Sequence, residues 1–114
     1  MEQDQAQEQE NGRQHDVPLP DPTLLTLVSG LAAQTMVSLG IFPNPVDGQT
    51  RILLHQGKHL IDTVAMLSEK TSGHQTPEES KAFENILHEL RMIYVAAQDA
   101  KAKQDEKAKQ DASN

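Results

Sequence analysis

Apolar residues recur at helical spacing along three stretches of the chain, with polar or turn-forming segments between them. The first stretch, residues 23–39, is apolar on nearly every side. The second, from about residue 54 to 71, and the third, from 77 to about 97, each place apolar residues on one main face. Residues 52–54 could form a short extended piece or lead into the second helix, and the sequence offers no partner strand for them. The pattern predicts an all-α fold in which an N-terminal helix packs on an αα-hairpin.

The turn between the second and third helices carries the most specific local signals. Gly73 follows the expected end of the second helix and is suited to the left-handed conformation that often terminates helices. Thr76 is placed as the N-cap of the third helix, with Pro77 at its first position. Glu79 lies three residues after Thr76 and completes a capping box. These four residues are therefore predicted to have structural roles.

The main apolar face of each hairpin helix predicts the core. On the second helix that face consists of Leu53, Leu60, Ile61, Val64 and Leu67. On the third helix it consists of Phe83, Ile86, Leu87, Leu90, Ile93, Tyr94 and Ala97. A second patch with Met92 and Val95 falls on roughly the opposite side of the third helix.

The first helix contains no charged residue, and its apolar residues form three stripes instead of one. A fold of so few elements cannot cover all three stripes, so we expect an interface with a second copy or with another protein. The interface candidates on the first and third helices are Leu25, Leu31, Ala33, Met36, Val37, Met92 and Val95.

The two ends of the chain are polar. Residues 1–21 are rich in Gln, Glu and Asp and end in a proline-containing segment, which predicts a disordered acidic arm. Residues 22–97 form the predicted helical domain. Residues 98–114 mix Lys, Ala, Gln, Asp and Glu without an apolar stripe, so they are expected as a polar charged tail that could extend the last helix without docking on it.

Composition narrows the functional classes. The net charge of -7, the pI near 5.1 and the aromatic content of 3% argue against a nucleic-acid partner. The lack of cysteine excludes disulfides and thiolate zinc sites, which leaves oligomerisation as the ordinary support for a core of only about 75 foldable residues. Lack of cysteine fits a cytoplasmic location, and the first residues show no signal-peptide pattern.

Membrane association is an alternative because residues 23–42 have about the length of a transmembrane span. Six Thr, Ser and Gln residues dilute the hydrophobicity of this segment, and neither end carries a Lys/Arg flank. The sequence therefore does not favour a membrane partner.

Two small clusters could carry chemistry. His55, His59 and Asp62 have the spacing of metal ligands on one helical face, although a solvated polar face explains them equally well. In a hairpin closed near residues 72–76, Asp62 and Arg91 lie at similar distances from the turn. We therefore expect Arg91 to form an ion pair with Asp62 or Glu89 that clamps the hairpin, in preference to an anion-binding role.

A distributed set of residues supports a family resemblance. It comprises Ile61-Asp62, Met66-Leu67, Glu69-Lys70-Thr71, Gly73, Thr76-Pro77-Glu78-Glu79, Leu90-Arg91-Met92 and Tyr94. With the uncharged first helix and the turn that follows it, this pattern resembles the small bacterial proteins catalogued as domain of unknown function 1844. The resemblance implies a short, mostly helical, cytoplasmic protein and supplies no catalytic residue. Gly57, where alanine is more usual, and His74-Gln75 depart from the pattern.

The functional hypothesis is a non-enzymatic module for self-association or protein–protein interaction, with no cofactor. The sequence contains no recognisable nucleophile motif or phosphate-binding loop. The alternatives are a small metal-binding protein or enzyme that uses His55, His59 and Asp62, and membrane association through residues 23–42.

Overall fold

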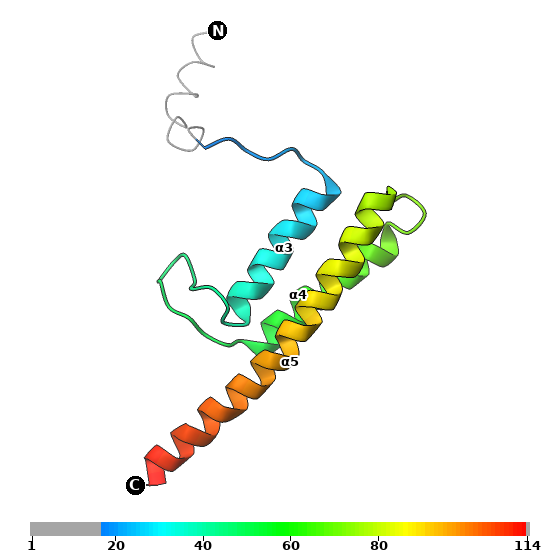
Figure 1. Ribbon diagram of the computed structural model, residues 1–114. Coiled ribbons are helices and arrows are strands. Elements are labelled where there is room, and N and C mark those ends of the chain that lie inside the picture. Colours follow the sequence, from blue (N-terminus) through cyan, green and yellow to red (C-terminus); the bar gives the residue numbers. More distant parts are fainter. Residues whose placement is uncertain (1–16, 114) are drawn as a thin grey trace, which may run out of the picture.

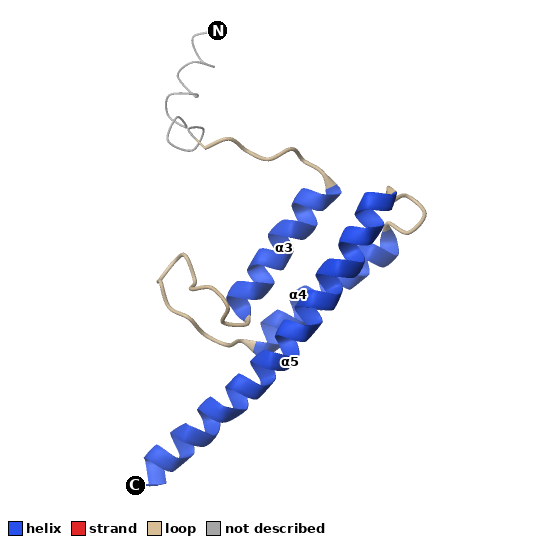
Figure 2. Cartoon of the chain, viewed as in Figure 1, coloured by secondary structure: helices blue, strands red, loops and turns tan. Residues whose placement is uncertain are grey.

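The computed structural model describes residues 17–113, which contain three helices (Figures 1 and 2). They are α3 (Leu24–Ser38), α4 (Leu54–Lys70) and α5 (Pro77–Ser113). No strand occurs within this range, so the predicted all-α class is confirmed. The starts of α3, α4 and α5 and the ends of α3 and α4 lie within one residue of the predicted positions. Most of the predicted N-terminal arm lies outside the described residues.

Helices α4 and α5 form the predicted hairpin, and α3 packs against both of them (Figure 1). Residues from all three helices meet in one hydrophobic core, which is built on the predicted faces of α4 and α5. Leu53 is the exception: it was predicted to belong to the core and is 42% exposed just before α4 begins. The buried members of the core are Val28, Ala32, Leu39, Ile61, Val64, Phe83, Leu87, Leu90 and Ala97. Each helix thus buries one side against the other two, as ridge-into-groove packing requires.

The inner face of α3 differs from all three apolar stripes that the sequence suggested. Thr35 and Ser38 are buried on this helix beside Val28 and Ala32. The hydroxyl of Thr35 donates a hydrogen bond of 2.7 Å to the carbonyl oxygen of Leu31, so its burial leaves no unpaired polar group. The pattern of apolar residues does not predict such a buried position. A threonine whose hydroxyl is hydrogen-bonded to its own helix packs like a small apolar side chain.

Helix α3 ends in a Schellman motif on Gly40, which has a φ of 82°. The amide of Gly40 donates to the carbonyl oxygen of Val37 at 3.2 Å, and the amide of Ile41 donates to that of Met36 at 2.9 Å. The connector then returns to α3, where the amide of Leu53 donates to the carbonyl oxygen of Ser38 at 2.7 Å. These bonds place the start of α4 beside the end of α3.

Gly57 gives α4 a notch for α3 at that place. A Cβ built on Gly57 would lie 2.3 Å from Cδ2 and 2.8 Å from Cγ of Leu39. Both residues are buried, so any larger residue at 57 would require Leu39 to move. The glycine that lowers the helix propensity of α4 therefore permits the close contact between the two helices.

The hairpin turn has the predicted local structure. Gly73 has a φ of 85°. The amide of Glu79 donates to Oγ1 of Thr76 at 3.1 Å, and the amide of Thr76 donates to Oε1 of Glu79 at 2.8 Å. Pro77 is the first residue of α5. The capping box and the left-handed glycine are confirmed.

Helix α5 is much longer than its partners and continues beyond the core. It has 37 residues, against 15 in α3 and 17 in α4, and therefore spans about 55 Å. Ala97 is the last residue of α5 in the buried core. Beyond it the helix projects from the hairpin (Figure 1), and its side chains are exposed except for a half-buried Lys101. Residues 98–113 are helical, and none of them belongs to the buried core.

Candidate interaction surfaces

The interface candidates on α3 separate into two groups. Leu25, Leu31 and Met36 are half-buried, and Leu31 and Met36 pack against the core. Ala33 is exposed, and Val37 is half-buried beside the connector. The first group therefore belongs mainly to the fold, whereas Ala33 and Val37 remain on the outer side of the helix.

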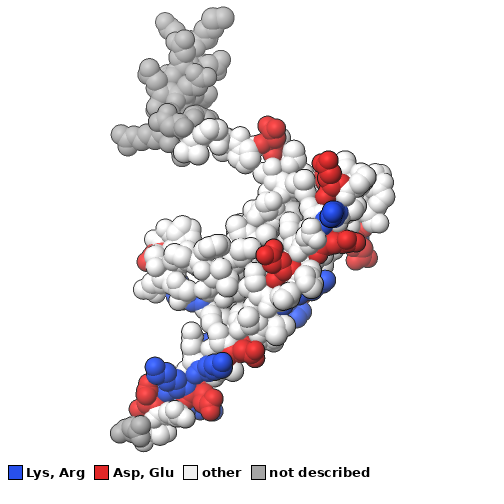
Figure 3. Space-filling view, in the orientation of Figure 1, with Lys and Arg blue, Asp and Glu red and all other residues white. Residues whose placement is uncertain are grey.

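The outer side of α3 is exposed and free of charge. Leu27 retains 52% exposure, and Gly30, Ala33 and Gln34 are also exposed. A Cβ built on Gly30 would meet no other atom within 4 Å. In Figure 3 the surface over α3 carries no Lys, Arg, Asp or Glu, whereas charged side chains follow α5. Leu27 is not among the interface candidates that the sequence suggested.

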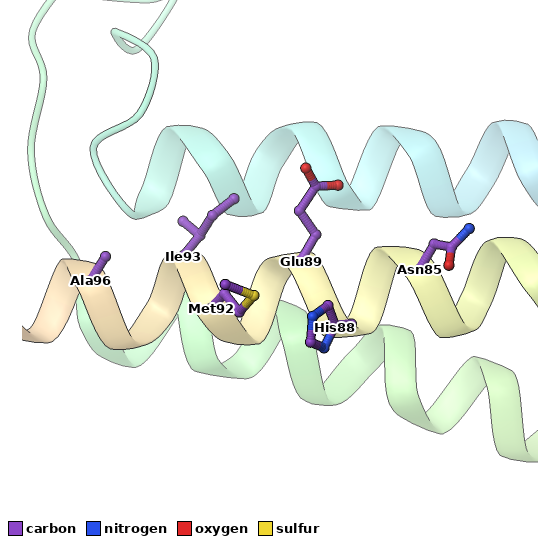
Figure 4. Close-up of a pocket in the computed structure, with 6 residues that line it drawn as sticks. All are labelled: Asn85, His88, Glu89, Met92, Ile93 and Ala96. Carbon is purple, nitrogen blue, oxygen red and sulfur yellow. The ribbon is translucent and has the colours of Figure 1, made fainter.

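The second patch on α5 lies where the sequence placed it. Met92 and Val95 are 61% and 57% exposed. Met92 lines a shallow open groove that Asn85, His88, Glu89, Ile93 and Ala96 also line. In Figure 4, Glu89 and Ile93 extend toward α3, whereas His88 and Met92 do not. The groove is shallow, and its lining mixes polar with apolar side chains.

The connector between α3 and α4 exposes apolar side chains that sequence reasoning missed. Ile41, Phe42 and Val46 are exposed, Val46 at 92%. The loop is internally hydrogen-bonded: the amide of Val46 donates to Oδ1 of Asn44 at 2.8 Å. The signal available in the sequence was the presence of these three large apolar residues among turn-forming residues.

Asp47 and Arg51 form an ion pair in the same connector. The amide of Gln49 donates a hydrogen bond of 3.0 Å to Oδ1 of Asp47. This backbone hydrogen bond, followed by the hydrogen bond from Arg51, lowers the pKa of Asp47 below its ordinary value. The connector therefore has a defined charge arrangement around its turn.

The proposed metal ligands are not assembled into a site. His55, His59 and Asp62 are all exposed on α4. Within residues 17–113 there is no group of three or more His, Cys, Asp or Glu side chains positioned to hold a metal ion. The carboxylate of Asp62 instead accepts a hydrogen bond of 2.9 Å from Nζ of Lys58, and this raises the pKa of Lys58.

The predicted clamp between Asp62 and Arg91 was wrong. The ion pairs of the described residues are Arg51–Asp47, Lys58–Asp62 and Lys101–Asp105. Neither Asp62 nor Glu89 pairs with Arg91. Equal distance from the hairpin turn fixes the position along the helix axis, but it does not make two side chains face each other. Lys58 lies one turn from Asp62 on the same helix and reaches it directly.

Comparison with known proteins identifies the family. A family model described as domain of unknown function (DUF1844) matches residues 21–96. The chain belongs to this family. The match covers α3, α4 and the part of α5 that packs in the core, and it confirms the resemblance seen in the sequence. The chain matches no curated protein and no solved structure.

The family boundary separates the packed part of the DUF1844 chain from its projecting part. The matched range ends at residue 96, one residue before the last buried position of α5. Among the described residues, no helix is both long and apolar enough to cross a bilayer.

Proposed function

We propose that this DUF1844 protein is a non-enzymatic interaction module whose α3 outer face, defined by Thr26, Leu27, Gly30, Ala33 and Val37, binds a second copy of the chain. One observation carries the proposal: a helix of 15 residues has an exposed side and no charged residue anywhere. Exposed helix faces in soluble proteins are normally rich in Lys, Glu, Arg and Asp. A face without them is typical of the centre of an interface, where charged residues are depleted.

The charge of the chain supports a second copy as the occupant. Two chains that each carry a formal charge of -7 repel one another, and like charges brought into contact would add to that repulsion. The α3 outer face is a helical surface on which two such acidic chains can meet without opposing any pair of like charges. A strongly basic partner, by contrast, would gain nothing from this face.

The order of small and larger residues along α3 allows the α3 helices of two copies to pack against each other. Thr26, Gly30, Ala33 and Val37 recur at spacings of four and three, so they lie along one line of the helix. A two-fold axis midway between Gly30 and Ala33 places Gly30 against Ala33 of the second copy and Thr26 against Val37 of the second copy. Such an isologous contact is the commonest way in which identical chains pair.

The remaining parts of the proposal follow from chemistry and composition. The described residues offer a shallow groove on α5 and exposed histidines on α4, without an assembled set of catalytic or metal-binding groups. This supports a binding function over an enzymatic one. A cytoplasmic location, expected from the cysteine-free composition, is part of the proposal.

Gly30→Glu tests the interface without weakening the fold. Nothing lies within 4 Å of the Cβ position, and replacing an exposed glycine within a helix should stabilise the monomer by up to about 1 kcal/mol. We expect the wild-type chain to be dimeric at micromolar concentration by light scattering, and Gly30→Glu to be monomeric with unchanged helical content. Ala102→Glu introduces the same side chain at an exposed position of α5 and should leave the dimer intact.

Two results would contradict the proposal. If the wild-type chain is folded and monomeric throughout the micromolar range, it does not self-associate and the proposal is wrong. If Met92→Glu dissociates the dimer and Gly30→Glu does not, the second copy binds the α5 patch and the α3 assignment is wrong.

A further inference from the structure

The last part of α5 contains a repeat. Residues 98–103 read Gln-Asp-Ala-Lys-Ala-Lys, residues 104–109 read Gln-Asp-Glu-Lys-Ala-Lys, and residues 110–111 begin a third copy with Gln-Asp. We call residues 98–113 the charged extension. A repeat of six residues does not match the helical period of 3.6, so successive copies rotate around the helix and the charged side chains are distributed over all its sides.

The repeat sets opposite charges one turn apart. Each lysine of the charged extension has an aspartate four residues away: Asp99–Lys103, Lys101–Asp105, Asp105–Lys109 and Lys107–Asp111. Lys101 and Asp105 are seen paired at 3.2 Å. Lys103 and Lys107 form the one like-charge pair at this spacing. The balance favours helix formation along the whole segment.

The base of the charged extension lies beside the start of α4, and the rest projects beyond it. Lys101 and Asp105 line a groove with residues 52–56, at the start of α4. Beyond Asp105 the remaining described side chains, Glu106 to Ser113, are exposed, and the shallow surface hollow among them is lined by α5 residues alone. A helix that is polar on all sides persists where pairs of opposite charge stabilise it.

We infer that the charged extension is a self-supporting helix that serves as a rigid spacer and needs no partner to remain folded. Its 16 residues hold their far end about 24 Å beyond Ala97. The packed part of α5 supplies the nucleus that an isolated helix of this length lacks, so each further residue adds a hydrogen bond without a new nucleation cost. The spacer does not depend on the α3 interface.

A distance measurement on the full-length chain tests the spacer. The chain has no cysteine, so Glu84→Cys with Ala112→Cys places two spin labels on α5 without background labelling. A continuous helix separates these positions by about 42 Å. We expect a narrow distance distribution near that value when labelled protein is diluted with an excess of unlabelled protein, which suppresses distances between copies.

Two exchanges that conserve composition test the role of the charge pairs. Asp105→Lys with Lys107→Asp turns three opposite-charge pairs into like-charge pairs and should broaden the distribution. Lys107→Asp with Asp111→Lys makes every pair of charged residues spaced four apart in the charged extension opposite in sign, and it should keep the distance distribution narrow. Salt at about 1 M, where the Debye length falls to about 3 Å, should broaden the wild-type distribution.

The inference is overturned by a broad wild-type distribution or by equally narrow distributions in both exchange variants. A distribution that broadens only in the Gly30→Glu background would also overturn it, because a second copy would then hold the extension in place. Loss of the dimer with an unchanged narrow distribution leaves the spacer intact, so its failure can be distinguished from failure of the α3 interface.

Discussion

Helix α3 and the charged extension of α5 are helices of similar length with opposite surface chemistry. α3 has 15 residues and no charge, and it is held by Val28, Ala32 and Leu39 in the core. The charged extension has charged residues on all sides and no buried residue. One helix thus depends on apolar contacts with other elements, and the other on interactions with its own neighbours one turn away. Helical structure alone therefore does not indicate which segment has a partner.

Substitutions on α3 and on the charged extension are expected to differ in the size of their effects. On α3, the core side should be sensitive to loss of volume, and the proposed interface predicts that the outer side is sensitive to added charge. On the charged extension, single substitutions change one or two weak pairs, each worth about 0.2–0.5 kcal/mol.

Leu39→Ala should have the largest effect. Leu39 is 2% exposed and packs where α3, its Schellman end and α4 meet. Removing its isopropyl group while keeping Cβ should lower the free energy of unfolding by about 2–5 kcal/mol. The matched change in the charged extension, Gln104→Ala, should alter it by less than about 0.5 kcal/mol. Denaturant melts at fixed protein concentration measure both, and comparable losses would abolish the contrast between the two helices.

Local chemistry explains why parts of the fold could be predicted from sequence. Thr76, Pro77 and Glu79 act within one turn of helix, and Gly73 acts through its own backbone. The structure of the hairpin turn could therefore be predicted from the sequence. The burial of Thr35 and the notch at Gly57 depend on which helices meet, and helical periodicity contains no such information. The prediction of an ion pair between Asp62 and Arg91 was wrong for the same reason. Packing between the helices sets the direction of each side chain, and the sequence pattern does not contain it.

The candidate interaction surfaces could likewise be predicted from the sequence only in part. Met92 and Val95 were found because they oppose a clear core stripe on α5. On α3 the three apolar stripes were equivalent by sequence, and only packing against α4 and α5 separated the half-buried Leu31 from the exposed Leu27. The charge of a helix was visible in sequence, whereas the side it turns outward was not.

Gly57→Ala should have an intermediate effect that changes sign with its neighbour. In the wild-type background the new Cβ collides with Leu39, and overpacking of this kind costs about 1–3 kcal/mol. The gain in helix propensity, about 1 kcal/mol, offsets part of that cost. In the Leu39→Ala background the collision is gone, so the same substitution should stabilise. A double-mutant cycle by denaturant melts measures the coupling, and additive effects would mean that α3 and α4 do not meet closely there.

Asp47→Asn should have the smallest effect, and the effect should depend on pH. The connector after α3 contains the ion pair of Arg51 with Asp47, so it can be compared with the charged extension. The pKa of Asp47 is lowered from 3.8 by the Gln49 amide and then by Arg51, so its carboxylate is stabilised in the folded chain. That contribution is fully present above the unfolded value of 3.8 and is lost as the pH falls through the lower folded value. Denaturant melts should therefore show wild type slightly more stable than Asp47→Asn at neutral pH, with the difference vanishing well below pH 3.8. A difference that stayed constant across this range would show that the side chain acts through the shape of the turn, with Asn replacing Asp as acceptor, and that the connector, unlike the charged extension, owes nothing to its charges.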